Sequence, residues 1–157
     1  MKQRSLKKSI GTVLTGIIIA TSSLAYGASD VEDEGNTCTN ARFTGSYGFS
    51  QLGSVVGIAP APVPAADVGV FHADGKGNLN GSEIVNVGGR HFRDTFTDGK
   101  YQVNPDCTGT ATWTAVFSDG RPAESRSASF VVTDHFKELH ILSTGPGAVL
   151  VGIARKQ

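Results

Sequence analysis

The sequence predicts an all-β fold, an antiparallel up-and-down β-barrel of about 8–10 strands. Turn signals built from Gly, Asn, Asp and Pro recur about every ten residues along most of the chain. Short runs rich in Val, Ile, Phe, Thr and Tyr lie between the turns, as is typical of strands. No run shows the pattern of a helix of useful length. These observations together predict short strands joined by tight hairpins.

The turns delimit nine strand candidates in chain order, at residues 43–52, 67–73, 78–87, 90–97, 100–104, 108–117, 125–133, 136–144 and 148–155. Most of the turns that separate them are explicit in the sequence, at residues 74–77, 88–89, 98–99, 104–106, 119–120 and 145–147. Sequential hairpins favour a barrel, and a two-sheet β-sandwich is the alternative. An up-and-down barrel closes antiparallel only with an even number of strands, so one candidate is split or missed.

One long connection, residues 53–66, lies between the first two strand candidates. It carries Pro60, Pro62 and Pro64, and prolines remove backbone donors from a sheet. We therefore expect a loop or a cap and not a central strand. Two interpretations stay open: a binding loop beside the mouth of the barrel, or a stiff surface connector.

The N-terminus has the pattern of an export signal. Four Lys or Arg residues fall within the first eight positions, and a short apolar run follows at 10–20. Cleavage sites fit after Ala25 or after Gly27. The alternative, a membrane anchor, would need an apolar run of about 20 residues. We expect residues 1–27 to be a cleaved signal peptide, which places the mature protein in the periplasm or outside the cell.

The mature chain is acidic and long enough for one domain. The whole chain has 14 basic and 14 acidic residues, and removal of the four basic residues of 1–27 leaves 10 against 14, a net charge of −4. This charge argues against nucleic acid and against insertion into an anionic membrane. We expect a polar leader at 28–40 and a single barrel domain at 41–157. The oligomeric state is left open.

The two cysteines predict one disulfide bond. Cys38 and Cys107 are the only pair in a chain that we expect to be exported. In the entropic model, a closed loop of this size would stabilise the fold by about 4 kcal/mol. The alternative is a reactive thiol or a metal ligand, but no His or second Cys lies at ligand spacing. We expect no metal site and no cofactor.

The hairpin turns predict which side chains face the interior. A loop at Gly88-Gly89 places Glu83 opposite Asp94, and a loop at Asp98-Gly99 places Phe96 opposite Tyr101. A turn at 74–77 places His72 opposite Leu79. The predicted interior face is mainly apolar and consists of Val68, Val70, His72, Leu79, Glu83, Val85, Phe92, Asp94, Phe96, Tyr101 and Val103.

The opposed carboxyl groups of Glu83 and Asp94 are the candidate catalytic residues. Two carboxylates in an apolar setting cannot both ionise easily, so desolvation and like charge raise at least one pKa. A bulge that turns one of them outward, or an ion pair with Arg90 or Arg93, would remove this site. The candidate ligand-binding residues around the pair are His72, Phe92, Phe96, Tyr101 and Trp113.

The rhythm of strands and turns resembles small secreted bacterial proteins of the calycin-like type. The resemblance rests on residues 45–49, 68–70, 73–77, 99–103 and 106–110. Their barrels are similar to those of the lipocalins and of the allene oxide cyclase and dirigent group. The resemblance implies a barrel with a ligand-sized interior. It transfers no catalytic residue, because the functional motifs of these families are absent and Gly45-Ser46-Tyr47 stands where lipocalins have Gly-x-Trp.

Three functional hypotheses follow. The leading one is an exported barrel that binds a small apolar or amphipathic molecule. The second is a cofactor-free cyclase or isomerase, in which Glu83 or Asp94 handles a proton or stabilises positive charge. The third is a structural cell-surface protein with a filled barrel. A cavity of a few hundred Å³ would separate the first two from the third.

Overall fold

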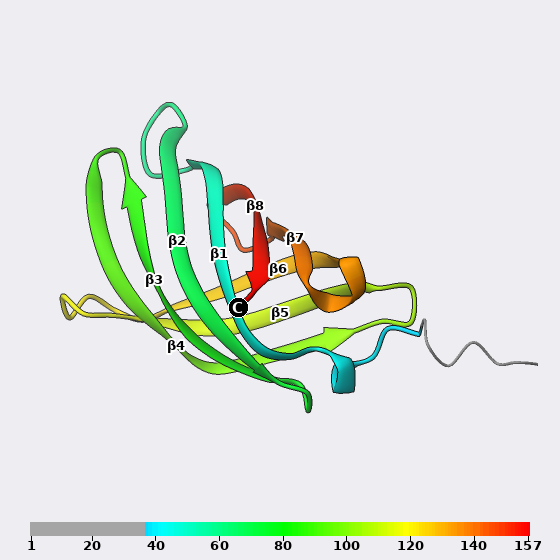
Figure 1. Cartoon of the computed structure of the whole chain (residues 1–157). Coiled ribbons are helices and arrows are strands. Elements are labelled where there is room, and N and C mark those ends of the chain that lie inside the picture. Colours follow the sequence, from blue (N-terminus) through cyan, green and yellow to red (C-terminus); the bar gives the residue numbers. More distant parts are fainter. Residues whose placement is uncertain (1–36) are drawn as a thin grey trace, which may run out of the picture. The chain divides into compact units, whose positions relative to one another are not determined.

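The computed structural model describes residues 37–157, which form a closed barrel of eight antiparallel strands. Each strand pairs with the next along the chain, and β8 pairs with β1, as Figure 1 shows. The predicted up-and-down barrel is therefore confirmed. The predicted signal peptide and most of the leader lie outside the described residues. The strands are β1 (Thr44–Val55), β2 (Val63–Asp74), β3 (Asn78–Val87), β4 (Arg90–Val103), β5 (Thr108–Phe117), β6 (Glu124–Thr133), β7 (Glu138–Ser143) and β8 (Ala148–Lys156).

The hairpin predicted at Asp98-Gly99 is wrong. The strand candidates 90–97 and 100–104 belong to the single strand β4, so the barrel has an even number of strands. These residues lie within β4 as an irregularity, where the register with β5 shifts between Thr97 and Lys100. Asp98 has a φ of 53°, and a bulge can use positive φ as a hairpin turn does. The prediction that Phe96 and Tyr101 share the interior nevertheless holds, since both are buried.

The register predicted for β2 is wrong by one residue. The loop between β2 and β3 has three residues, so Ala73 pairs with Leu79 and His72 pairs with Asn80. A shift of one residue moves every side chain of a strand to the other face. Val68 is accordingly 56% exposed, and His72 also lies on the outer wall. The inner face of β2 instead carries alternate residues that include Asp67.

The connection between β1 and β2 is shorter than predicted, because β1 continues to Val55 and β2 begins at Val63. Pro64 is thus inside a strand. Its carbonyl accepts a hydrogen bond from the N–H of Gly88, 2.9 Å away in the turn after β3. The N–H that proline lacks would face this same turn, outside the β2–β3 ladder, whose last pair at this end is Ala65 with Val87. The proline therefore removes no bond from the ladder.

One end of the barrel is filled by aromatic side chains. The ring of Phe43 lies 5.0 Å from that of Tyr47, 4.9 Å from Tyr101 and 5.5 Å from Phe130. The hydroxyl of Tyr47 donates to the carbonyl of Phe136 at 2.8 Å, and that of Tyr101 donates to the carbonyl of Phe43 at 2.8 Å. Burial raises the pKa of Tyr47 to about 12, which keeps it a neutral donor. We call this region the closed half.

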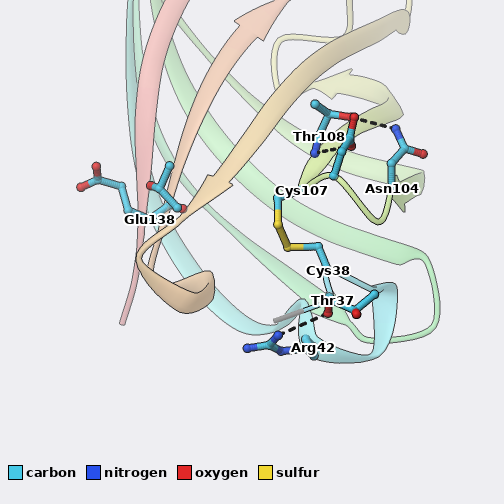
Figure 2. The surroundings of a disulfide bond; sticks show 9 residues. Thr37, Cys38, Arg42, Asn104, Cys107, Thr108 and Glu138 are labelled. Carbon is cyan, nitrogen blue, oxygen red and sulfur yellow. Dashed lines mark hydrogen bonds between the residues drawn. A yellow bond between two sulfur atoms is a disulfide. The ribbon is translucent and has the colours of Figure 1, made fainter. Parts of the chain in front are cut away.

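Two short helical turns and the disulfide complete the closed half. The turns are η1 (Asn40–Arg42) and η2 (Asp134–Phe136). Cys38 and Cys107 are bonded, as predicted, with their Cα atoms 5.0 Å apart. Figure 2 shows this bond joining the segment before β1 to the turn between β4 and β5. The N-terminal segment is thereby fastened to the end of the barrel that the aromatic side chains fill.

Candidate ligand-binding site

The other end of the barrel holds a pocket of about 680 Å³. Figure 1 shows the loop between β1 and β2 and the turn between β3 and β4 at this same end, away from η1. Val56, Ile58 and Ala59 of the β1–β2 loop line the pocket, and so do Gly145–Gly147 between β7 and β8. Of the two interpretations of residues 53–66, this lining favours a loop beside the mouth of the barrel. We call this region the open half.

Three side chains form the boundary between the two halves. Gln51, Glu83 and Trp113 line the large pocket, and they also line a smaller cavity of about 60 Å³ beneath it. The other residues around the smaller cavity are almost all apolar and include Phe96. These three side chains are thus the floor of the open half, where a polar layer meets the aromatic core.

Three carboxyl groups from adjacent strands lie at this level, and all are buried. Asp67 of β2 is 5% exposed, Glu83 of β3 is 6% exposed and Asp94 of β4 is 1% exposed. Glu83 lies directly opposite Asp94 in the ladder, as the Gly88-Gly89 turn predicts, and Asp67 pairs with Val85 next to them. The alternative in which a bulge turns one carboxyl group outward is therefore wrong. The catalytic role stays a prediction.

Burial raises the pKa of all three carboxyl groups. Desolvation raises that of Asp67 to about 7, and the charge of Arg126 opposes the shift. Desolvation is also the main cause for Glu83, whose pKa rises further because Asp94 and Asp67 repel its charge. Burial raises the pKa of Asp94, although its interaction with the Glu83 carboxyl group and the charge of Arg126 both oppose this shift. At neutral pH the cluster therefore retains a proton, which belongs to the pair of Glu83 and Asp94.

Five buried polar atoms at this level have no hydrogen-bond partner among residues 37–157: Asp67 Oδ1, Asp94 Oδ1 and Oδ2, Trp113 Nε1 and Arg126 Nε. The acceptors come from β2 and β4. The donors come from β5 and β6, where Trp113 lies directly opposite Arg126 in the ladder. Buried polar atoms without partners cost free energy, so folding alone does not explain them.

Two of the three arginine side chains that line the open half form ion pairs. Arg126 forms an ion pair with Glu124 at 2.7 Å. Arg121 pairs with Asp119 at 2.6 Å and lies 3.7 Å from the centre of the Phe92 ring. No ion pair joins Arg90 or Arg93 to a carboxylate in the described part of the chain, so that alternative is wrong.

The five predicted ligand-binding residues do not all line the same cavity. Phe92 and Trp113 line the large pocket, and Phe96 lines the smaller cavity. The interior position predicted for His72 is wrong, because its side chain lies on the outer wall of the barrel. Tyr101 lines neither cavity. It belongs to the closed half, where its hydroxyl donates a hydrogen bond to the carbonyl of Phe43.

Sequence reasoning missed Asp67 and Arg126. Asp67 is missed because the one-residue error in β2 turns it outward. Arg126 had a usable signal, since it keeps the period of two with the inward Ala128 and Phe130 of β6. A register carried back along β6 would have placed it inside.

Between Thr37 and Gln157, no group of three or more His, Cys, Asp or Glu side chains is arranged to hold a metal ion. None of the helices in the described range is long and apolar enough to cross a membrane. Comparison with protein-family models, with curated proteins and with solved structures found no match. The architecture that the calycin-like resemblance implies is present, and the function must be argued from the site itself.

Proposed function

We propose that this protein binds a small amphipathic molecule in the open half of its barrel. The observation that carries the proposal is the pocket of about 680 Å³, which is lined by the buried carboxyl groups of Asp67 and Glu83, with Asp67 Oδ1 unpartnered. A pocket of this size is typical of sites for small molecules. The polar atoms at its floor would find their partners in the ligand.

The lining supports an amphipathic occupant. Val55, Val63 and Leu150 provide an apolar wall, and Phe92 and Trp113 provide aromatic surfaces. The polar groups gather at the floor. A bound molecule would therefore direct its polar head inward and lay its apolar body against the upper wall.

The disulfide supports an exported setting, because such bonds persist in oxidising compartments. Together with the signal pattern, it favours the periplasm or the extracellular space. The calycin-like resemblance of the sequence agrees with a barrel that carries a small molecule there.

The second candidate is a cofactor-free isomerase or cyclase. The observation that favours it is the direct pairing of Glu83 with Asp94, where a protonated carboxyl group faces one that lacks partners. Such a pair can donate a proton to a bound molecule and accept one back. If the molecule extracted from the protein is converted to an isomer on incubation, and Glu83→Gln abolishes the conversion, the enzyme hypothesis replaces the binding hypothesis.

Binding can be measured through Trp113, the only tryptophan of the chain, which lies at the floor of the pocket. We expect octan-1-ol to change its fluorescence in a saturable manner. Ala148→Phe should weaken binding, because Ala148 lines the pocket. Val149→Phe is the matched control, since Val149 is exposed on the outer wall.

Native mass spectrometry of protein purified from the exported fraction supplies the second arm, with extraction and identification of any bound molecule. Equal affinity of the two variants would contradict the pocket as the binding site. Wild-type protein that binds no octan-1-ol and carries no extractable molecule would overturn the proposed function.

A further inference from the structure

We propose that the molecule bound in the open half is an amphipathic amine with a hydrogen-bond-accepting oxygen close to its nitrogen. This inference rests on the proposed function and adds the chemical class of the ligand. It stands on the arrangement of charges and unpartnered atoms around the floor of the pocket.

The floor carries more acidic than basic groups. Asp67 and Glu83 line the pocket at this level, and Asp94 is buried beside them, opposite Glu83 in the ladder. Arg126 is the basic side chain at the same level, and it is paired with Glu124. Gln51 and Trp113, which come from β1 and β5, do not titrate in the relevant range. The charged groups that line the pocket are Asp67 of β2, Glu83 of β3, Arg90 of β4, Arg121 in the loop after β5, and Glu124 and Arg126 of β6. Behind them, Asp94 lies opposite Glu83 and Asp119 pairs with Arg121. Arg90 and Arg121 belong to the segments at the mouth of the pocket, so the excess of acidic groups is confined to its floor, and a cation is the charge that would complement it there.

The hydrogen-bond inventory points the same way. An ammonium group has three donors and no acceptor. Asp67 Oδ1 and the two oxygens of Asp94 are three acceptors without partners. The proton that Glu83 and Asp94 share serves one of them, so two acceptors remain for a ligand. A carboxylate ligand would leave both unpartnered and would add like charge.

Two unpartnered donors on β5 and β6 are the reason for placing an oxygen atom in the proposed ligand. Trp113 Nε1 and Arg126 Nε are donors without partners, and the two residues face each other across β5 and β6. An oxygen atom near the amine would accept from this wall while the nitrogen donates to β2 and β4. A single polar head could thereby satisfy both sides of the floor.

The test compares four probes of equal chain length by the fluorescence of Trp113: n-octylamine, octan-1-ol, octanoate and 2-aminooctan-1-ol. Hydrogen bonds to charged groups are worth more than neutral ones, so at about pH 8 octylamine should bind roughly tenfold more tightly than octan-1-ol. Octanoate should bind most weakly. The amino alcohol should bind several-fold more tightly than octylamine.

The affinity of octylamine should also depend on pH. An alkylamine remains protonated below about pH 10, whereas burial raises the pKa of Asp67 to about 7, so this carboxyl group ionises between about pH 5 and about pH 8. Octylamine should therefore bind more tightly at about pH 8 than at about pH 5. The affinity for octan-1-ol should change much less.

Asp94→Asn and Asp67→Asn should each reduce the preference for octylamine over octan-1-ol about tenfold. Glu138→Gln is the matched control, because Glu138 pairs with Arg155 on the outer wall. The pH series on wild-type protein gives the answer even if a variant fails to fold.

Equal or tighter binding of octan-1-ol or octanoate would overturn the amine assignment while the proposed function survives. An amino alcohol that binds no more tightly than octylamine would overturn the assignment of the oxygen. If none of the four probes binds and the purified protein carries no extractable molecule, the proposed function itself fails.

Discussion

The closed and open halves of this barrel are built on the same eight strands but filled in opposite ways. In the closed half, rings such as Phe43, Tyr47 and Phe130 meet across the axis. In the open half, Ala65 and Ala148 take the inward positions near the mouth, and a pocket of about 680 Å³ remains. The comparison indicates that stability is concentrated at one end. The other end can then hold buried carboxyl groups that destabilise the fold.

Two glycines, one in each half of the barrel, show the same contrast between dense packing and open space. A Cβ atom on Gly109 would lie 2.3 Å from the ring of Phe130, so the closed half requires glycine there for space. A Cβ atom on Gly89, in the turn at the open end, would have nothing within 4 Å. Gly89 is needed only for its φ of 87°. One glycine serves packing and the other serves only a turn.

The largest expected effect comes from the centre of the closed half. Phe43→Ala should lower the free energy of unfolding by about 3–5 kcal/mol, because the cavity it leaves is surrounded by other rings. Ile58→Ala, in the loop at the mouth, should change it by less than about 0.5 kcal/mol. Urea denaturation measures both. Similar losses from the two variants would remove the distinction between the halves.

The disulfide should have the next largest effect. Replacing Cys38 and Cys107 together by Ala should lower the free energy of unfolding by about 4 kcal/mol in the entropic model, given the 69-residue separation. Binding of octan-1-ol should be retained if the variant is folded, since the bond lies in the closed half. A loss of binding by the folded variant would show that the two ends are coupled.

Glu83→Gln should stabilise the protein in a pH-dependent way. The pKa of Glu83 rises from 4.5 in the unfolded chain to about 9 in the barrel, so the unfolded chain releases this proton first. The wild-type free energy of unfolding therefore falls as pH rises between these two values. The glutamine cannot ionise, and we expect a gain on the order of 2 kcal/mol at about pH 8 that shrinks toward pH 4. Urea denaturation across this range measures the difference, and a difference independent of pH would refute the assignment.

The smallest effect concerns the backbone of η2. His135 has a φ of 54° and an exposed side chain. Glycine adopts this conformation without steric strain, so His135→Gly should stabilise the fold by about 0.5 kcal/mol. His91→Gly, at an exposed position of β4, should instead destabilise it by about 0.5–1 kcal/mol. Thermal unfolding of the two variants would show shifts of opposite sign, and shifts of the same sign would contradict the argument.

The barrel could be predicted because its signals are local. Turn residues with positive φ and strands of period two are visible in any short window of the chain. The Gly88-Gly89 hairpin was short enough to place Glu83 opposite Asp94 correctly. A single pair of cysteines in a chain that we expect to be exported left little choice for the disulfide.

The errors arose where one local signal fits two structures. A positive φ at Asp98 serves a bulge in β4 as well as a hairpin. The predicted turn had four residues, 74–77, whereas the loop has three, 75–77. This difference reversed the faces of β2, which exchanged His72 for Asp67 in the interior. The Asp74 carboxylate accepts hydrogen bonds from the N–H groups of Lys76 and Asn78 and so stabilises the shorter loop. A pattern of turn residues alone does not reveal these side-chain bonds.

The most direct test of the account is an NMR titration of the wild-type protein with n-octylamine, followed through the backbone amides. We expect saturable shifts in the inner strand segments around Val63–Asp67 and Glu83–Val85, and in the loop that carries Ile58. The amides of Tyr47, Tyr101 and Phe136 in the closed half should move little. Shifts concentrated in the closed half or on the outer wall around Val151, or no saturable shifts at all, would contradict the division of this barrel into a packed half and a binding half.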